Sequence, residues 1–196
     1  MDRLKITGKN KLKGSISVHG AKNSALPILV SSLLNKNHLV LKNIPEVDDI
    51  GNMLKLLKSF GSKINKNKTS LIINNNKIKN ISADYDIVRK MRASILLLGP
   101  LLSRFGYARI SLPGGCAIGT RPIDIHLKGL SQLGVSFNIE NGFVVGKVKN
   151  TLKGNKINLP FPSVGATENI MMSAVLAKGE TLLLNSAKEP EIHDLG

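Results

Sequence analysis

One cysteine of this chain stands in a loop whose composition suits chemistry. Cys116 lies within residues 112–124, LPGGCAIGTRPID, a stretch with three glycines and two prolines between a predicted strand and a predicted helix. Loops of this kind carry functional residues more often than regular elements do. Arg121 follows Cys116 closely, and a nearby cation makes a thiol more reactive. The pattern predicts a chemical role for Cys116, although a lone cysteine is usually a small buried apolar residue.

Two further segments place a cation at the predicted start of a helix. Lys22 and Asn23 precede an apolar run, and Arg92 holds the corresponding position in a later segment. Free backbone amides at a helix N-terminus attract anions, and an arginine can bind a phosphate or carboxylate through two parallel hydrogen bonds. The pattern alone leaves an ordinary loop lysine and a surface salt bridge open as alternatives.

A fourth segment, FPSVGAT at residues 161–167, opens another predicted helix. The hydroxyls of Ser163 and Thr167, with the amides that follow, could bind phosphate oxygens. An ordinary helix N-cap is an equally good interpretation of Ser163. The 4 histidines are scattered along the sequence, so the pattern predicts neither a metal site nor a Ser-His-Asp arrangement.

The composition of the chain argues against several functional classes. The net charge is +15, but aromatic residues make up only 4% and the lysines are dispersed, often beside asparagine. Nucleic-acid recognition favours aromatics and arginine, so the charge argues less for a basic polyanion-binding module. Solvated loops rich in lysine and asparagine are the preferred interpretation of the charge, and a cytosolic enzyme with anionic substrates is a second one that is compatible with it. The apolar runs fall short of the ~20 residues of a membrane span, and the N-terminus lacks the apolar region of a secretory signal. We therefore expect a cytoplasmic location, with neither nucleic acid nor membrane as a partner.

The elements that must position these segments recur three times. Each copy reads as an apolar helix, a short strand, a turn with proline, and an aspartate before a second amphipathic segment. The aspartates, Asp49, Asp124 and Asp194, are roughly 70–75 residues apart, which fits one supersecondary unit per copy. Each is expected to cap a second helix or to complement its dipole. Gly61 and Gly134 fit the position after such a helix.

Strand pairs follow the second helix in the first two copies. Residues 62–64 precede 70–73, and residues 135–139 precede 143–145 with an Asn-Gly hairpin turn between them. The unit therefore reads β-α-β-α-β-β, and the predicted class is α/β (α+β). The third copy stops at Asp194, where its second helix should begin, so a fragment is preferred over an atypical last unit.

Taken together, these segments resemble the UDP-N-acetylglucosamine enolpyruvyl transferases, also called 1-carboxyvinyltransferases. The matching stretches, in order and spacing, are Gly20–Asn23, Met91–Ser94, Leu112–Cys116, Arg121–Asp124, Ser163–Thr167 and Glu189–Ile192. The resemblance covers essentially the whole chain and implies the N-terminal half of such an enzyme. It implies an inverted α/β barrel fold of two domains, each with three β-α-β-α-β-β repeats.

The resemblance also implies a division of this chain. Residues 1–21 would be a strand segment of the second domain, and residues 22–196 would form most of one domain. The repeats would span about 22–88, 89–154 and, incompletely, 155–196. An unfinished third repeat is expected to leave apolar side chains such as Ile170, Val175 and Leu176 without packing partners.

The implied reaction transfers the enolpyruvyl group of phosphoenolpyruvate to the 3-hydroxyl of UDP-N-acetylglucosamine and releases phosphate, without a cofactor or a metal. It is the first committed step of peptidoglycan synthesis and proceeds by addition and elimination. The resemblance implies that Cys116 acts as the acid, captures phosphoenolpyruvate covalently and is alkylated by fosfomycin.

The implied substrate contacts come from all four segments. They are Lys22 and Asn23 for phosphoenolpyruvate, and Arg92, Arg121, Pro122, Ile123, Asp124, Ile125, Phe161, Pro162, Ser163 and Val164 for UDP-N-acetylglucosamine, with Arg92 and Arg121 also able to join the cationic shell around phosphoenolpyruvate. Some relatives carry a lysine at the position of Phe161, so one diphosphate contact is expected to be absent. The carboxylate base would lie in the missing C-terminal half, so the chain alone is expected to be catalytically incomplete.

Other interpretations stay open. The shikimate-pathway enolpyruvyl transferases share the fold but lack the cysteine loop, so residues 113–116 argue against them. The remaining alternatives are the polyanion-binding module and a non-catalytic fragment. Such a fragment would retain nucleotide-sugar affinity or pair with a separately encoded second half.

Overall fold

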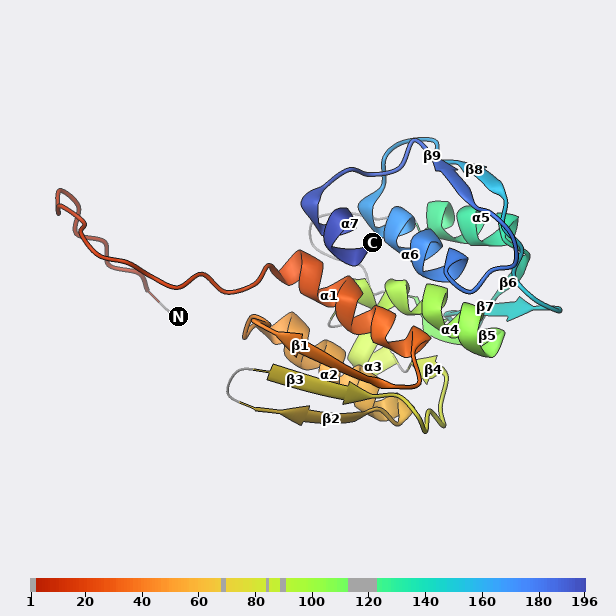
Figure 1. Ribbon diagram of the computed structural model, residues 1–196, viewed down its shortest axis with the longest axis horizontal. Helices are drawn as coiled ribbons and strands as arrows, with labels where there is room; N and C mark the ends of the chain where they lie inside the picture. The colour runs from red at the N-terminus through yellow and green to blue at the C-terminus, as the bar shows by residue number, and fades with distance from the viewer. Residues whose placement is uncertain (1–2, 68–69, 84, 89–90, 113–122) are drawn as a thin grey trace.

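The computed structural model describes residues 3–67, 70–83, 85–88, 91–112 and 123–196 (Figure 1). The predicted site residues Cys116, Arg121 and Pro122 lie outside these ranges. The first third of the described chain contains α1 (Lys22–Ser31), the 3-10 helix η1 (Ser32–Leu34), β1 (His38–Lys42), α2 (Asp48–Phe60), β2 (Lys63–Lys66) and β3 (Ser70–Asn74).

The middle and last thirds repeat this order. The middle third contains β4 (Ser82–Ala83), α3 (Tyr85–Val88), η2 (Arg92–Leu97), α4 (Leu98–Phe105), β5 (Tyr107–Ser111), α5 (Asp124–Gln132), β6 (Val135–Glu140) and β7 (Phe143–Val148). The last third contains β8 (Lys156–Asn158), α6 (Val164–Ala174), β9 (Leu182–Leu184) and α7 (Pro190–Leu195).

The described strands form three separate sheets. The middle sheet has the order β4-β5-β7-β6, with β4 parallel to β5 and the other pairs antiparallel. The first sheet, β1-β3-β2, reproduces the last three strands of that order, and the parallel pair β8-β9 reproduces the first two. The predicted α/β class is confirmed, and the middle unit shows the whole β-α-β-α-β-β order. These three sheets do not join into one closed barrel within the described residues.

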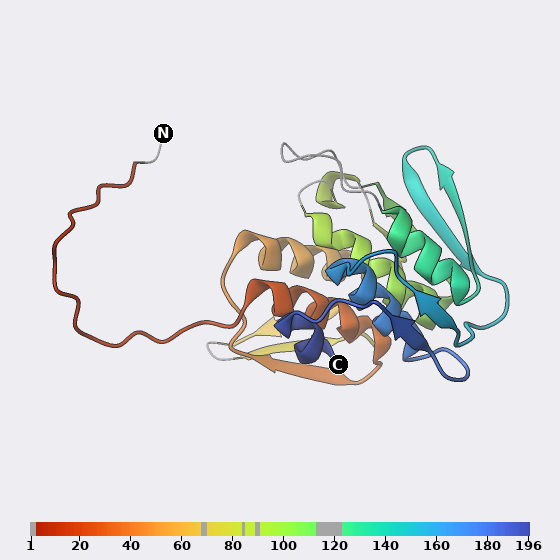
Figure 2. The same ribbon diagram turned by 90° about the horizontal axis from the view of Figure 1, so that it is seen from above.

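Three helices, one from each unit, form the centre of the molecule. α1, α4 and α6 run side by side with their N-termini on the same side, and Figure 2 shows this arrangement from above. Their apolar side chains, such as Leu29, Leu101 and Ile170, are fully buried in one core. Burial of each such side chain contributes about 1.5–3 kcal/mol to folding, so the core fixes the direction in which these helices start.

A buried amide joins the central helices. Asn169 of α6 donates through Nδ2 to the carbonyl of Ile95 at 2.9 Å, and the same nitrogen lies 3.0 Å from Nδ1 of His126. Its Oδ1 accepts from the amide of Gly99 at 2.7 Å. Both polar atoms of the Asn169 side-chain amide therefore have partners, as burial requires.

Arg104 of α4 ties the middle unit to the first. Its guanidinium donates to the carbonyls of Leu33 at 2.7 Å, Asn35 at 3.1 Å and Asn75 at 2.9 Å. These carbonyls lie at the ends of η1 and β3, where regular backbone pairing stops. A charged donor at such a place satisfies acceptors that are otherwise left open.

Two predictions about the third unit need correction. The second helix of this unit, α7, begins at Pro190 rather than at Asp194, because a proline at the first helical position has a φ that already suits the helix. Val175 and Leu176 are exposed as predicted, at 68% and 43%, but Ile170 is fully buried. Its side chain packs where Gly129 of α5 has no Cβ, since a Cβ there would overlap it.

The glycine and hairpin predictions are confirmed where they can be followed. Gly61 ends α2 with φ of 107°, and Gly134 follows α5 with φ of 103°. Asn141 and Gly142 have φ of 50° and 78°, the pair of positive values that a two-residue turn between antiparallel strands requires. This turn sets the register of β6 against β7.

An N-terminal arm leaves the body of the molecule. Residues 3–20 contain neither helix nor strand and extend away from α1 (Figures 1 and 2). The arm exposes between 81% and 95% of each of its large apolar side chains, Leu4, Ile6, Leu12, Ile16 and Val18. That residues 1–21 belong to a second domain stays a prediction.

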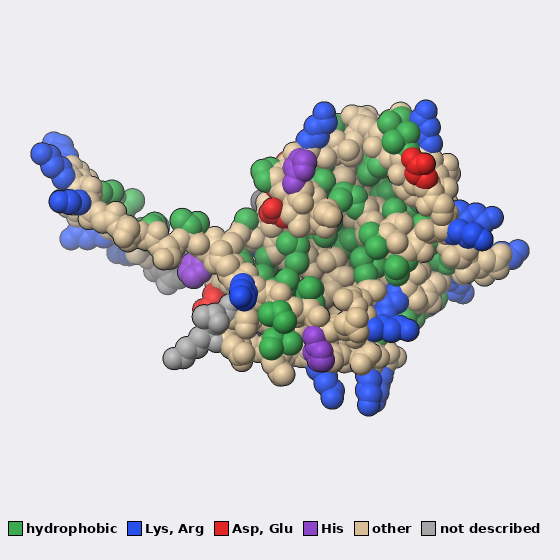
Figure 3. Space-filling view, viewed as in Figure 1, with side chains coloured by type: hydrophobic (Ala, Val, Ile, Leu, Met, Phe, Trp, Pro, Cys, Tyr) green, Lys and Arg blue, Asp and Glu red, His purple; other side chains and the backbone are tan. Residues whose placement is uncertain are grey.

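Charge is spread over the surface. Figure 3 shows lysine and arginine side chains along the arm and around the edge of the body rather than gathered in one patch. A nucleic-acid interface needs cations clustered on one face or groove, which this face does not offer. Within the described ranges, no helix combines the length and the apolar character needed to cross a membrane.

Candidate functional site

The first turn of α1 is built to attract an anion. Lys22 and Asn23 are its first two residues, and both are exposed. The N-cap residue Ala21 offers no side-chain cap, and the turn contains no acidic residue, so its first amides keep their partial positive charge. Pro27 has no amide proton, so the carbonyl of Asn23 also lacks its usual intrahelical donor.

Two carboxylates from other helices hold this turn. Nζ of Lys22 lies 2.8 Å from Oδ2 of Asp49, and the hydroxyl of Ser24 donates to Oδ2 of Asp194 at 2.5 Å. The expected capping role is therefore wrong for both aspartates. Asp49 lies in the first turn of α2, where it complements the dipole without capping, and Asp194 is near the end of α7. Their side chains are directed to α1 instead.

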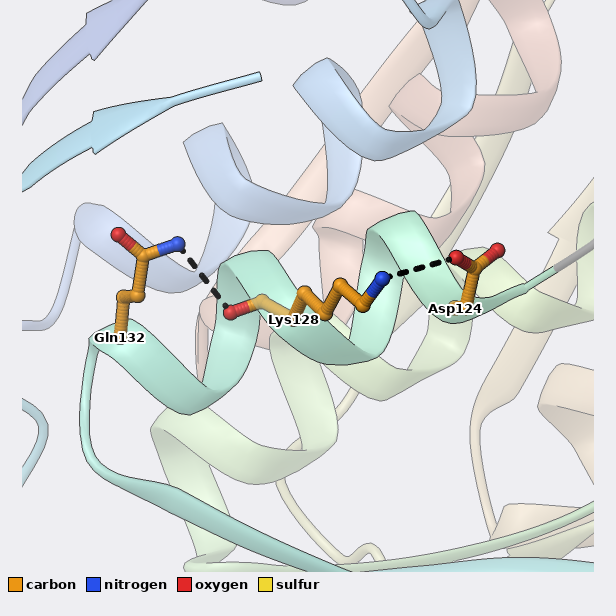
Figure 4. Close-up of polar contacts among 3 residues, drawn as sticks. All are labelled: Asp124, Lys128 and Gln132. Atoms are coloured by element: carbon orange, nitrogen blue, oxygen red, sulfur yellow. Dashed lines mark hydrogen bonds and ion pairs between the residues drawn. The ribbon is translucent and has the colours of Figure 1, made fainter. Parts of the chain in front are cut away.

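The third equivalent aspartate behaves differently. Asp124 is exposed and forms an ion pair with Lys128, one turn further along α5, at 3.3 Å (Figure 4). Gln132 donates to the backbone carbonyl of Lys128 at 3.4 Å, which continues the same helix face. An exposed pair of this type is weak, so the carboxylate of Asp124 remains accessible to a ligand.

Neighbours of Asp124 contribute in different ways. Ile123 is half-buried and precedes the helix, and Ile125 is only 6% exposed. The side chain of Ile125 belongs to the core, so only its backbone is left for the predicted nucleotide contact.

The segment before α6 resolves an open alternative. The hydroxyl of Ser163 accepts from the amide of Ala166 at 3.4 Å, so the N-cap interpretation is confirmed. Thr167 is buried, and its hydroxyl accepts from the amide of Ala187 at 3.0 Å. A phosphate contact by Thr167 is therefore wrong. Phe161 and Pro162 are exposed, and Val164 is half-buried at the start of the helix.

The starts of α5 and α6 meet at Gly165, beside the end of η2. A Cβ at Gly165 would lie 3.0 Å from Cε1 of His126 and 3.9 Å from the side chain of Leu96. The fold thus brings the predicted nucleotide segments 123–125 and 161–164 together. Arg92 begins η2, a helix that packs against both α6 and α1. Sequence spacing alone gives no sign of this convergence.

Burial shifts two titratable groups near this junction. It lowers the pKa of His126 to about 4, so the ring is neutral at pH 7 and serves the Asn169 network. Burial also raises the pKa of Glu168 to about 7, with a smaller contribution from the charge of Glu191 on α7. The described residues contain no group of three His, Cys, Asp or Glu side chains that could hold a metal ion.

A separate cavity opens beside α2. It has a volume of about 800 Å³, and its polar lining includes His19, Asn43, Glu46, Asp48 and Lys66. The two acidic residues that begin α2 therefore have different neighbours. Asp48 lines this cavity, whereas Asp49 pairs with Lys22.

Comparison with known proteins places the chain in one family. Residues 6–196 match the family described as EPSP synthase (3-phosphoshikimate 1-carboxyvinyltransferase). The chain belongs to this family of enolpyruvyl transferases.

Within the family, the chain is similar to a particular group of curated proteins. It is 52% identical over 197 residues to the UDP-N-acetylglucosamine 1-carboxyvinyltransferase of Granulibacter bethesdensis, which covers 100% of this chain and 47% of that protein. It is 53% identical over 195 residues to the protein of that name from Pelagibacter ubique, with 100% and 47% covered. The chain spans about half the length of the curated relatives it matches, so the resemblance predicted from the motifs is confirmed and the coverage fits one half.

Solved structures agree on the fold. The enolpyruvyl transferase NikO from Streptomyces tendae superposes with a TM-score of 0.81 at 19% identity, over 96% of this chain and 44% of that one. An EPSP synthase from Acinetobacter baumannii gives a TM-score of 0.74 at 19% identity, over 92% and 42%. At this identity the likeness establishes the enolpyruvyl transferase fold alone.

Proposed function

We propose that this chain supplies one half of a UDP-N-acetylglucosamine enolpyruvyl transferase. The reaction moves the enolpyruvyl group of phosphoenolpyruvate to the 3-hydroxyl of UDP-N-acetylglucosamine and releases phosphate. The observation that carries the proposal is identity above 50% to proteins of that name over the full length of the chain. The anion-attracting turn of α1 supports it independently.

The chemistry divides between two steps. In the addition, Cys116 gives a proton to the methylene carbon of phosphoenolpyruvate while the sugar oxygen bonds to the neighbouring carbon and its hydroxyl proton passes to a base. In the elimination, that methyl carbon loses a proton and the C–O bond to phosphate breaks. The base and the other substrate contacts belong to the second half, which is the partner that the proposal requires.

Lys22 and the amides of α1 suit the phosphate that leaves. Charge on the phosphate oxygens grows as the C–O bond breaks, and fixed positive groups lower the energy of that state. Asn23 beside Lys22 carries both a donor and an acceptor to orient the sugar hydroxyl. Arg92 and Arg121 would add further positive charge around phosphoenolpyruvate.

The junction at Gly165 suits the nucleotide sugar. Asp124 offers an accessible carboxylate, and the backbone of Ile123 and Ile125 lies on either side of it. The resemblance adds Pro122 to this set of nucleotide contacts. Phe161 and Pro162 expose apolar surface, while Ser163 and Val164 present the start of α6 to the diphosphate. Because Phe161 carries no charge, the amides of α6 must bind the diphosphate without a lysine at that position.

The cellular setting follows from the same proposal. This reaction commits a nucleotide sugar to peptidoglycan synthesis, and through it to cell shape and division. Its substrates are small anions of the cytoplasm, and the thiol of Cys116 would be the target of fosfomycin.

A chimera tests the proposal. The part of the Pelagibacter ubique relative beyond the matched segment is joined to this chain, and phosphate release is measured with both substrates and with each omitted. We expect release that needs both substrates, and we expect none from this chain alone. A folded chimera that releases no phosphate with both substrates present would contradict the proposal.

A further inference from the structure

The ion pair between Lys22 and Asp49 joins two helix N-termini that are distant in sequence. The two residues are 27 positions apart, and their atoms Nζ and Oδ2 are 2.8 Å apart. The side chains are 47% and 34% exposed, less than in the described pairs Lys66–Glu46, at 60% and 74%, and Lys128–Asp124, at 75% and 51%. The Lys22 pair is therefore the better shielded from solvent.

Helix electrostatics alone do not favour this place for the ammonium group. Lys22 stands at the positive end of its own helix, where a cation is disfavoured. Asp49 offsets that effect and gives the side chain a defined direction. The hydrogen bond from Ser24 to Asp194 holds the backbone of the same turn from the other side, so the principal freedom left in the turn is that of the Lys22 side chain.

An ammonium held in this way still has donors to offer. Of its three donors one is directed at Asp49, and two remain for an incoming anion. A free lysine side chain must lose much of its conformational freedom when it binds a ligand, and a restraint present beforehand lowers that loss.

We propose that Asp49 is a positioning residue that holds the Lys22 ammonium at the start of α1 for the phosphate group of phosphoenolpyruvate. This inference rests on the proposed function. In this proposal Asp49 does not contact the substrate, because its carboxylate acts through Lys22.

The direction in which the affinity for phosphoenolpyruvate changes distinguishes a positioning role of Asp49 from a purely electrostatic one. Loss of a carboxylate makes the region more positive, and by Coulomb attraction alone this strengthens the binding of an anion. Loss of a positioning contact weakens binding, because Lys22 must then be ordered by the ligand itself. The affinity of an Asp49 variant therefore moves in opposite directions under the two explanations.

The test uses the full chain and the reactivity of Lys22. Brief reductive methylation with formaldehyde and cyanoborohydride, read by mass spectrometry of peptides, gives the labelling rate of Lys22 with and without phosphoenolpyruvate. The variants are Asp49→Asn, Asp49→Glu and the matched control Glu46→Gln, which makes the same charge change in the pair with Lys66. Asp49→Ser is a second uncharged variant if Asp49→Asn does not fold.

We expect Asp49→Asn to raise the labelling rate of free Lys22. It should also raise the phosphoenolpyruvate concentration that half-protects this lysine by about two- to fivefold, the range of an exposed ion pair. Asp49→Glu should recover most of the protection, and Glu46→Gln should leave both measurements at the unsubstituted values.

Three results would overturn the inference. An unchanged labelling rate in Asp49→Asn would mean that the pair does not form in solution. Unchanged or stronger protection by phosphoenolpyruvate would mean that Asp49 contributes only charge. Both of these results leave the proposed function standing. Absence of protection both in the unsubstituted chain and in the active chimera would remove Lys22 from the anion site, and with it that part of the proposed function.

Discussion

At the scale of single residues, the central chemical prediction concerns Cys116. A serine has no proton of comparable acidity and cannot be alkylated in the same way, whereas an aspartic acid can still deliver a proton. In the active chimera, Cys116→Ser should abolish irreversible inactivation by fosfomycin, and Cys116→Asp should keep measurable phosphate release. Inactivation that persists in Cys116→Ser, or a folded Cys116→Asp chimera without activity, would remove the acid role.

Glu168 makes a second residue-scale prediction, about pH. Its pKa is raised to about 7 in the folded chain against an ordinary value of 4.5. The folded state therefore binds more protons between these values, and the contribution of Glu168 to stability falls as pH rises through this window. Glu168→Gln should stabilise the chain by about 1–3 kcal/mol at pH 8 and have little effect at pH 4.

Denaturant unfolding at several pH values measures this difference. The exposed Glu180 supplies the control variant Glu180→Gln, which makes the same charge change at the surface. A stabilisation by Glu168→Gln that is equal at pH 4 and pH 8 would contradict the raised pKa.

At the scale of elements, the contact between α4 and α6 depends on a glycine. A Cβ at Gly99 would lie 2.6 Å from the carbonyl oxygen of Asn169 and 2.7 Å from its Oδ1. Gly99→Ala should destabilise the chain by about 1–3 kcal/mol, since the helices must move apart and the Asn169 hydrogen bonds lengthen. Thermal unfolding is the measurement, and an unchanged midpoint would count against this packing.

A matched substitution is available within α2. Gly51 has nothing within 4 Å of the position of a Cβ, so Gly51→Ala adds the same methyl group without a clash. It should stabilise the chain by about 0.5–1 kcal/mol, because alanine is the better helix former.

Sequence patterns were sufficient for elements that local rules determine. The apolar run after Lys22 became α1 and η1, and Asn141 with Gly142 closed the hairpin as predicted. Patterns failed where a partner comes from a distant part of the chain. Nothing in the sequence shows that Asp49 turns to Lys22, or that Ile170 finds space at Gly129, because these contacts exist only after the helices have packed.

The same limit applies to the candidate site. Each predicted segment was placed at a loop or a helix start, and the structure agrees for Lys22, Asp124 and Ser163. The contact between the starts of α5 and α6 at Gly165 required the packing of these two helices, which the spacing of the segments does not indicate. The choice between a cap and a phosphate contact for Ser163 required the position of one amide, which sequence spacing does not contain.

At the scale of the whole molecule, the arm should contribute little to the stability of this chain. The apolar side chains of the arm are exposed, and the backbone hydrogen bond that ties its described residues to the body runs from the amide of Gly20 to the carbonyl of Asn43 at 3.1 Å. Deletion of residues 1–18 should therefore change the free energy of unfolding by less than about 1 kcal/mol. It should also raise solubility, since exposed apolar surface promotes association.

Equilibrium unfolding of the shortened chain, with light scattering at rising concentration, measures both effects. The unshortened chain is the reference for each. A large loss of stability after deletion would show that the arm packs against the body in solution.

The repeated sheet order has a consequence for the entropy of the chain. The strands β6 and β7 are separated by 2 residues, whereas the parallel pairs β4–β5 and β8–β9 are each separated by 23, residues 84–106 and 159–181. In an unordered chain, bringing together the ends of a 23-residue segment costs about 2 kcal/mol more in conformational entropy than closing the 2-residue turn. The burial of the central helix that lies between the two strands of each parallel pair therefore offsets this entropy cost. A change that weakens the packing of that helix also weakens the pairing of the two strands.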